Sequence, residues 1–319
     1  MRAIVVSAHG PPRVLVASEA PDPTSGPGRA LIDVKIANVT FVETQVRAGT
    51  APFPGPPLPY IPGNGVGGVV TAVGEGADSA LVGVEVIASL DGSGGYAERA
   101  AADAAALIPV PDGMPITDAV ALLADGRTAT GLMESARVQP GETVLVEAAA
   151  GGVGSLLVQL ARNAGAEVVA TAGGQRKLDL ARSLGAEVVV DYTEAQWADR
   201  LREQVGGVDV VFDGVGGDTG RAAFELLVPG GRFCPFGLAS GAFADVTDDE
   251  AAARGVNRVQ DGRRAPEDLR ERTRAALREA AAGRLQPTIG QTFPLADAAA
   301  AHAAIESRAT LGKTLLMAR

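Results

Sequence analysis

The chain has 319 residues, of which 46% are hydrophobic and 21% are charged, and its formal net charge is −10. This length exceeds that of most single-core proteins, so we expect two domains with a cleft between them. The acidic balance argues against nucleic acid, whose phosphates require a basic surface, and the apolar runs are too short to span a bilayer. The N-terminal apolar stretch is too short for a signal peptide, so we expect a cytoplasmic protein with no membrane partner.

The residue counts also limit metal chemistry. The single cysteine, Cys234, excludes an intrachain disulfide and a cysteine-rich zinc site. His9 and His302 are the only histidines, so we predict no metal, and we interpret His302 as a surface or packing residue of an alanine-rich helix. The stretch from Arg254 to Arg278 contains eight arginines interleaved with acids, and we interpret it as a solvated helix face rather than a polyanion site.

The first third of the chain predicts a compact, mostly antiparallel β domain. Short β-branched runs alternate there with glycine and proline, which is typical of short strands joined by turns. The predicted strands are 3–6, 30–37, 66–73, 84–90 and 96–101. Between them, residues 51–62 contain six prolines, which exclude helix and central strand and predict a long loop of the kind that often borders a site.

After Pro115 the pattern changes to strands that alternate with helices, which predicts a parallel, doubly wound sheet. Near-continuous apolar runs predict buried strands at 144–148, 167–171, 188–190, 208–212 and 232–236. Helical spacing predicts helices at 116–123, 128–136, 156–164, 176–184, 219–227 and from Pro266 to near Gly283. Strands are predicted again at 288–293 and 314–317, and we expect this tail to rejoin the first domain.

A dinucleotide fingerprint follows the first of these buried strands. The sequence Ala149-Ala150-Gly151-Gly152-Val153-Gly154 lies directly between the strand 144–148 and a predicted helix, which is the context that the motif requires. Small residues allow the backbone to approach a pyrophosphate, and the helix N-terminus faces the phosphates. The alternative is a glycine-rich turn that binds nothing.

The end of the second strand favours NADPH over NADH. NAD sites usually carry an acid there for the ribose hydroxyls, whereas this chain has Thr171-Ala172-Gly173-Gly174-Gln175 followed by Arg176 and Lys177. Two cations can bind a 2′-phosphate, although they could also simply occupy an exposed helical turn. The loops 213–217 and 236–241 follow the next two strands and are either contacts for the nicotinamide half or plain turns.

Several motifs together resemble one enzyme family. They are Ala148 to Gly154, 208–217, Gly230-Gly231-Arg232-Phe233, Leu311-Gly312-Lys313-Thr314, Val46-Arg47-Ala48-Gly49, Pro62-Gly63 with Gly67-Gly68-Val69-Val70, and Gly126-Arg127-Thr128-Ala129. The chain is similar nearly end to end to the medium-chain dehydrogenase/reductase superfamily. Within it, the chain looks like the zinc-independent NADPH:quinone oxidoreductases of the zeta-crystallin type.

This resemblance implies an α/β fold with two domains, and it implies NADPH as the hydride donor. A GroES-like catalytic domain would comprise 1–118 and 263–319, and a Rossmann domain would comprise 119–262 and join two chains into a homodimer. The resemblance assigns phosphate contacts to Gly151, Gly152, Val153 and Gly154, the 2′-phosphate to Lys177 with Arg176 and Tyr192, and nicotinamide contacts to Thr128, Phe236 and Gly237. Further cofactor contacts are expected from Ala150, Gly173, Gly174, Gly214, Val215, Gly312 and Lys313.

The substrate region departs from the family pattern. Members often have Asn, Asp and Tyr where this chain has Thr40, Glu43 and Ala51, and a Glu where it has Asn64. Thr40, Asn64, Tyr60 and Arg47 are the candidate catalytic and pocket residues. Alternatively, Arg47 only forms a salt bridge with Glu43, and Tyr60 only packs among the prolines.

The expected reaction is hydride transfer to a quinone or an α,β-unsaturated carbonyl compound. The cofactor carries the chemistry, while hydrogen-bond donors such as Thr40 or Asn64 would meet the developing oxyanion and solvent would supply the proton. An enoyl reductase for a polyketide-type intermediate and a non-catalytic NADPH-binding protein are the alternatives. A zinc alcohol dehydrogenase ranks last.

Overall fold

The computed structural model describes residues 1–259 and 265–318. The chain divides into two compact units, Met1–Ala124 with Pro287–Arg319, and Asp125–Gln286. The second unit therefore includes the described residues 265–286, which the sequence analysis assigned to the first domain. Side chains of one helix hold this segment, because Gln159 exchanges two hydrogen bonds of 2.9 Å with the backbone of Gln286, and Asn163 donates to the Arg284 carbonyl at 2.7 Å.

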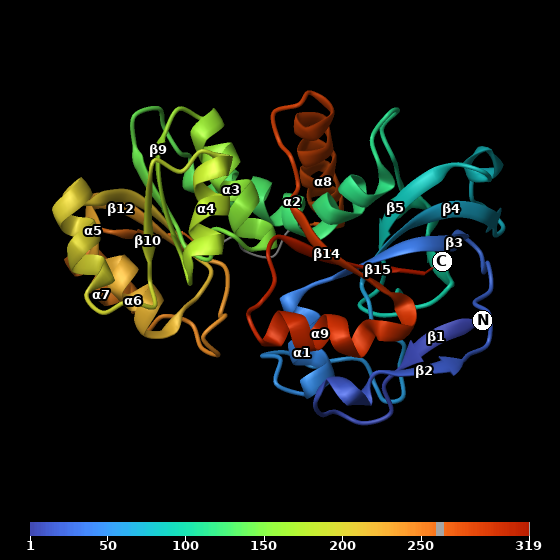
Figure 1. Cartoon of the computed structure of the whole chain (residues 1–319). Coiled ribbons are helices and arrows are strands. Elements are labelled where there is room, and N and C mark those ends of the chain that lie inside the picture. Colours follow the sequence, from blue (N-terminus) through green and yellow to red (C-terminus); the bar gives the residue numbers. More distant parts are fainter. Residues whose placement is uncertain (260–264, 319) are drawn as a thin grey trace. The chain divides into compact units, whose positions relative to one another are not determined.

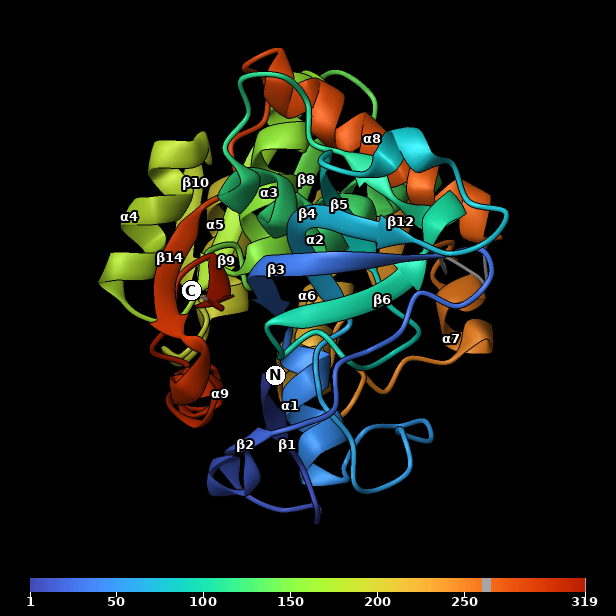
Figure 2. The same cartoon turned by 90° about the vertical axis from the view of Figure 1, so that its right-hand side faces the viewer.

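The first unit contains a seven-stranded sheet of order β14-β15-β3-β4-β5-β7, with β6 paired to β3 (Figures 1 and 2). Only β14 and β15 are parallel to each other, and the other pairs are antiparallel. The strands are β3 (Arg29–Val39), β4 (Gly65–Val73), β5 (Glu85–Ser89), β6 (Arg99–Asp103), β7 (Ile108–Pro109), β14 (Ile289–Pro294) and β15 (Lys313–Met317). The antiparallel β domain is confirmed, and so is the return of the tail, because Met317 of β15 pairs with Ile36 of β3.

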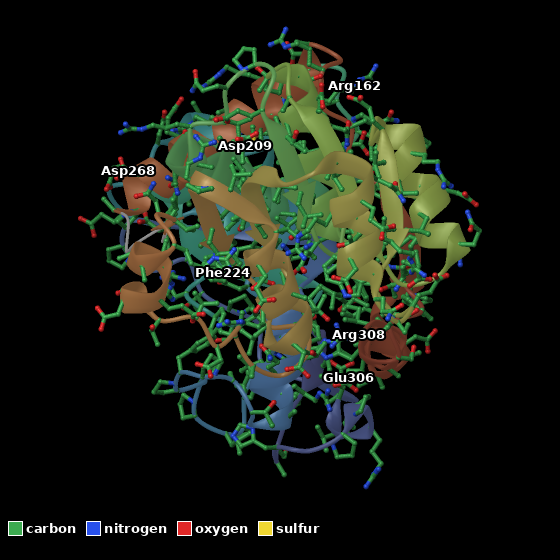
Figure 3. All side chains as sticks on the ribbon, turned by 90° about the vertical axis from the view of Figure 1, so that its left-hand side faces the viewer. Arg162, Asp209, Phe224, Asp268, Glu306 and Arg308 are labelled. Carbon is green, nitrogen blue, oxygen red and sulfur yellow. The ribbon has the colours of Figure 1, made fainter. Side chains whose placement is uncertain are left out.

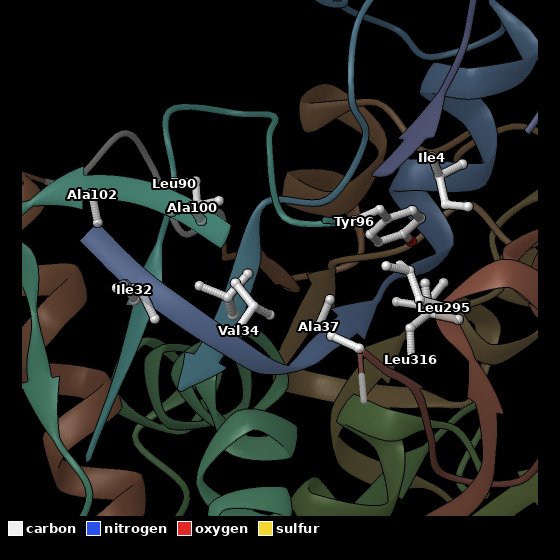
Figure 4. Packing of buried hydrophobic residues seen from close by; sticks show 14 of the residues in the cluster. Ile4, Ile32, Val34, Ala37, Leu90, Tyr96, Ala100, Ala102, Leu295 and Leu316 are labelled. Atoms are coloured by element: carbon white, nitrogen blue, oxygen red, sulfur yellow. The ribbon is translucent and has the colours of Figure 1, made fainter. Parts of the chain in front are cut away.

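The core of this unit lies against β3. Alternate residues of β3, Ile32 and Val34, point to one face, where they pack with Leu90, Ala100 and other apolar side chains (Figure 4). A separate hairpin of β1 (Arg2–Val5) and β2 (Val16–Glu19) and the helices α1 (Phe41–Ala48) and α9 (Ala298–Glu306) complete the unit. Residues 51–59 contain no helix or strand, as the prolines predicted.

The second unit contains a six-stranded sheet of order β10-β9-β8-β11-β12-β13, in which every pair is parallel. The strands are β8 (Thr143–Val146), β9 (Glu167–Ala172), β10 (Val188–Asp191), β11 (Val208–Asp213), β12 (Leu227–Pro235) and β13 (Asn257–Arg258). The strand order reverses between β8 and β11, and ligands of such sheets bind at that switch point, beyond the carboxyl ends of the strands. The predicted doubly wound sheet is confirmed.

Helices cover both faces of this sheet (Figure 1), with α3 and α4 on one face and α5 and α6 on the other. The helices are α3 (Gly152–Asn163), α4 (Gln175–Leu184), α5 (Trp197–Val205), α6 (Gly217–Glu225), α7 (Asp248–Ala253) and α8 (Pro266–Ala281). Their starts follow the predictions within a few residues, but α5 and α7 lacked a recognised pattern. No helix among residues 1–259 and 265–318 is long and apolar enough to cross a membrane.

The prediction of two separate helices after Pro115 was wrong. The segments 116–123 and 128–136 form one continuous helix, α2 (Ile116–Ala136). A glycine inside a helix costs about 1 kcal/mol, and burial of apolar residues such as Leu122 and Leu132 on either side of Gly126 outweighs that cost.

The arginine-rich stretch is not one solvated helix face. Arg254 ends α7, Arg258 lies in β13, and Arg263 and Arg264 lie outside the described residues. Arg272 of α8 is buried, and its Nε donates to Glu134 of α2 at 2.8 Å.

Candidate functional site

A buried carboxylate, Glu43, organises the polar residues of the first unit. Thr40 caps α1, and its hydroxyl accepts from the Glu43 amide at 3.3 Å while the Glu43 carboxylate accepts from the Thr40 amide at 2.7 Å. This reciprocal capping box fixes both residues at the start of the helix. The second Glu43 oxygen accepts from the Asn64 amide at 2.7 Å, and the Asn64 side-chain oxygen accepts from the Gly92 amide at 2.9 Å. Thr40 and Asn64, 24 positions apart, therefore share one anchor.

Glu43 also contacts a tyrosine from a distant part of the chain, and this tyrosine in turn contacts a histidine. The Tyr96 hydroxyl lies 3.3 Å from a Glu43 oxygen and 3.0 Å from Nε2 of His302 in α9. Burial raises the pKa of Glu43, against the lowering effects of the Thr40 and Asn64 amides and of Lys313. Burial lowers the pKa of His302 to about 3, so this histidine is neutral at physiological pH and serves packing rather than proton supply.

Arg47 does not form the salt bridge with Glu43 that was one alternative for it. Its guanidinium is 1% exposed and bonds to the Gly10 carbonyl and to Glu306 at the end of α9. Arg308, next to Glu306 at the end of α9 (Figure 3), lies with its guanidinium carbon 4.9 Å from the centre of the Phe41 ring. These contacts join α1 to α9 and give Arg47 a structural role.

Tyr60 lies beside Arg47 and does more than pack among the prolines. Its backbone forms a bridge with Val6, and its hydroxyl is buried without a hydrogen-bond partner among residues 1–259 and 265–318. Burial raises the pKa of Tyr60, and the charge of Arg47 opposes this shift. A buried hydroxyl without a partner is costly, so this group is available to a ligand.

In the second unit, the fingerprint forms the turn between β8 and α3. Gly151 is the N-cap of α3 and no side chain caps the helix, so the first amides have no acceptor within it. A β-carbon on Gly152 would lie 2.0 Å from a carboxylate oxygen of Asp125, and one on Gly154 would lie 2.3 Å from the Ala148 carbonyl oxygen. The loop therefore requires glycine, and the amides at the N-terminus of α3 fit a pyrophosphate. Ala150 lies in the same turn, and Val153 lies in the first turn of α3.

The loop after β9 brings together the residues expected at the 2′-phosphate. Gly174 is the N-cap of α4 with a φ of 87°, and Arg176 and Lys177 occupy the first turn. A β-carbon on Gly173 would lie 3.5 Å from the Tyr192 ring, so Tyr192, which follows β10, packs against the loop. Asp191, which the sequence analysis did not single out, holds the loop by accepting from the Gly174 amide at 2.8 Å.

The loops after β11 and β12 contact each other. Gly214 lies against Phe236, because a β-carbon there would be 2.7 Å from the Phe236 ring, and Gly237 lies against the Gly214 backbone. Asp213 positions Val215, because the Asp213 carboxylate accepts a hydrogen bond from the Val215 amide at 2.9 Å. These loops and the two described above all follow strands of one parallel sheet, so they lie at the same edge.

The remaining predicted residues lie elsewhere. Thr128 is in the middle of α2, and Gly312 and Lys313 belong to the first unit, where Gly312 has a φ of 51° and Lys313 begins β15 and is buried. Glu147, a fully buried acid directly after β8, was not among the predicted site residues. The signal for it was an acidic residue inside the apolar run 144–148.

Within the described part of the chain, no group of three or more His, Cys, Asp or Glu residues could hold a metal ion. The thiol of Cys234 is buried, and burial raises its pKa to about 12.

Comparisons with known proteins agree with this two-unit organisation. Residues 26–112 match the alcohol dehydrogenase GroES-like domain, and residues 152–277 match the zinc-binding dehydrogenase family model. The 2-haloacrylate reductase of Burkholderia is 32% identical over 99% of this chain and 98% of its own length. The quinone oxidoreductase of Rattus norvegicus is 33% identical over 99% and 98%.

A solved structure extends this likeness to the fold. The Escherichia coli quinone oxidoreductase in complex with NADPH has a TM-score of 0.92 and 30% identity, and the match covers 99% of this chain and 100% of that chain. The chain therefore belongs to the zinc-independent quinone oxidoreductase family of the medium-chain dehydrogenase/reductase superfamily.

Proposed function

We propose that this chain is an NADPH-dependent reductase that transfers hydride to a quinone or to an α,β-unsaturated carbonyl compound. The uncapped glycine turn between β8 and α3, placed at the switch point of a parallel sheet, carries the proposal. Family membership supports it, since one relative is named a quinone oxidoreductase, another a 2-haloacrylate reductase, and a structural neighbour contains NADPH.

When bound, NADPH supplies the hydride, and the protein holds and orients it. Ala150 and Gly151 to Gly154 would hold the pyrophosphate with backbone amides. Lys177, with Arg176 and Tyr192, would bind the 2′-phosphate beside Gly173 and Gly174. The nicotinamide half would be held by Thr128, Gly214, Val215, Phe236, Gly237, Gly312 and Lys313.

On the acceptor side we assign the hydrogen-bond donors Thr40, Asn64 and Tyr60. The Thr40 hydroxyl uses its oxygen to cap α1, so its O–H can still donate, and no residue that the structure describes forms a hydrogen bond with the Tyr60 O–H. Such donors would stabilise the negative charge that develops on a reduced carbonyl oxygen. Arg47 supports this region from behind through its bonds to Gly10 and Glu306.

We further propose that the protein is a cytoplasmic homodimer. The only cysteine is buried and free, which suits a reducing compartment. In the described part of the Rossmann sheet, β13 forms an outer edge beside β12, which offers backbone groups to a second copy. Size-exclusion chromatography with light scattering tests this, and a monomer mass at micromolar concentration would contradict it.

The cofactor assignment is tested by titrating the protein with NADPH and NADH, before and after Lys177→Ala. We expect NADPH to bind at least about tenfold more tightly, roughly 1.4 kcal/mol, and the variant to lose that preference. Arg182→Ala, at the other end of α4, is the matched control and should keep it. Binding of neither nucleotide by the wild type would overturn the assignment.

A turnover assay distinguishes a reductase from a protein that only binds NADPH. NADPH oxidation is followed with a quinone and with an enone as the acceptor. Consumption of NADPH with either supports the reductase, whereas tight NADPH binding without turnover would indicate a non-catalytic binding protein.

A further inference from the structure

Three polar side chains form a row across the carboxyl ends of three neighbouring strands at the switch point. Val146 of β8 pairs with Ala170 of β9 and with Phe212 of β11, so the next residues, Glu147, Thr171 and Asp213, lie side by side in register. The Glu147 amide continues the ladder by donating to the Phe212 carbonyl at 3.1 Å. All three side chains are fully buried, with 0% exposure. Such a row is unusual, because buried polar groups are nearly always paired.

The register of β8 with β11 places the two carboxyl groups of this row, Glu147 and Asp213, next to each other on neighbouring strands. A carboxylate can only accept hydrogen bonds, so a hydrogen bond between these two groups requires one of them to carry a proton. No other donor meets Oδ2 of Asp213 or either oxygen of Glu147 at hydrogen-bond geometry among the described residues. One proton shared between the two groups would satisfy both.

The surroundings decide which group holds this proton. Oδ1 of Asp213 already accepts from the amides of Val215 at 2.9 Å and Gly216 at 2.7 Å, which leaves Oδ2 as the acceptor for a proton held by Glu147. Burial raises the pKa of Glu147 well above its ordinary value, and the adjoining Asp213 raises it further, against a smaller lowering by the Val215 amide. The other neighbours do not compete, since Thr171 on β9 is uncharged and α6 presents Gly220.

Asp213 is also the point where several segments meet. Its backbone carbonyl accepts from the amides of Phe236 at 2.8 Å and Gly237 at 3.1 Å. On its other side, a β-carbon on Gly220 would lie 2.4 Å from Oδ2, so α6 leaves Asp213 no room to turn away. Asp213 thus joins its own loop, the loop after β12 and α6.

We propose that Glu147 is a positioning residue, a protonated carboxylic acid that donates a hydrogen bond to Asp213 and so holds the loop 213–217 against the fingerprint turn. The proposal rests on the proposed function, because these are the loops assigned to NADPH. Glu147 immediately precedes the turn, and Ala148, with a φ of 48°, begins it. One hydrogen bond therefore links the pyrophosphate loop to the loops assigned to the nicotinamide half.

Two substitutions of matched size separate a donor from a space-filling side chain. In Glu147→Gln the side-chain NH₂ can donate to Asp213, whereas Glu147→Leu fills a similar volume without a donor. We expect the NADPH dissociation constant of the Glu147→Gln protein to stay within about twofold of the wild type. That of the Glu147→Leu protein should rise about tenfold or more, which corresponds to the loss of one buried hydrogen bond. Circular dichroism confirms that both variants are folded.

The pH dependence of NADPH binding is a second test, because a purely structural role of Glu147 would not change it. Because the bound arrangement requires the proton, raising the pH should weaken NADPH binding by the wild type more than by Glu147→Gln, whose donor does not titrate. The other titratable groups near the turn, Asp213 and Asp125 of α2, are present in both proteins, so the difference between the two curves isolates Glu147.

Infrared spectroscopy tests the protonation without any cofactor. The wild type at neutral pH should show the C=O stretch of a protonated carboxylic acid, and Glu147→Gln should lack it. Absence of this band in the wild type, a Gln variant as weak as Leu, or a Leu variant that binds NADPH normally would each overturn the proposal. If the wild type shows the band but binds neither nucleotide, the proposed function fails and the positioning role fails with it, while the shared proton stands.

Discussion

Replacing Gly154 by alanine should destabilise the protein and weaken NADPH binding. The new β-carbon would lie 2.3 Å from the Ala148 carbonyl oxygen and 2.9 Å from the Ala149 Cα. Both contacts are with backbone, so α3 and the fingerprint turn must separate by about 1 Å to reach an ordinary carbon–oxygen distance. In an unhindered helix the same change would stabilise by about 1 kcal/mol. Here we expect a loss of about 1–3 kcal/mol, as in other overpacked sites.

The assay combines urea unfolding, followed by circular dichroism, with NADPH titration. We expect the dissociation constant to rise at least about tenfold, because the displaced amides no longer converge on the pyrophosphate. Gly151→Ala is an intermediate case, since its β-carbon would lie 3.2 Å from the same oxygen. Gly26→Ala is the control, because beyond its two chain neighbours no described atom lies within 4 Å of the new β-carbon. A Gly154→Ala protein that is as stable as Gly26→Ala and binds NADPH like the wild type would refute the reasoning.

Two further predictions concern the buried polar network of the first unit. Glu306→Gln leaves the buried guanidinium of Arg47 without its counter-charge, so we expect the free energy of unfolding in urea to fall by about 1–3 kcal/mol. Glu279→Gln is the control, because Glu279 is the exposed partner of Arg284, and its loss should be less than about 1 kcal/mol. Equal losses in the two variants would contradict this prediction. His302 has its pKa lowered from 6.5 to about 3 by burial, so between these values the unfolded chain binds a proton that the folded chain does not. As the pH falls through this window, the wild type should lose about 1.4 kcal/mol per pH unit more than His302→Gln, and parallel stability curves would disprove the assignment.

The local sequence determined most of the Rossmann unit. Runs such as 144–148 and 208–212 are buried on both faces of a parallel sheet, so they are apolar without alternation and can be recognised one by one. The fingerprint from Ala149 to Gly154 follows from the same kind of local constraint, because only small residues let the turn approach α3 and a phosphate. Family membership and the edge of the sheet where a cofactor would lie were therefore predictable.

Only the tertiary structure decided the partners of the polar side chains. Arg47 and Glu306 are 259 positions apart, and Tyr96 and His302 are 206 apart, so no periodic pattern connects either pair. The local alternative for Arg47, Glu43 one helical turn away, was wrong because Glu43 already accepts from the amides of Thr40 and Asn64.

The same holds for Glu147, whose neighbour Asp213 follows from the register of β8 with β11. Sequence patterns report which face of an element is buried, because burial acts on each residue separately. They do not report which two buried polar groups meet, because that depends on how strands and helices distant in the chain are aligned in the folded protein.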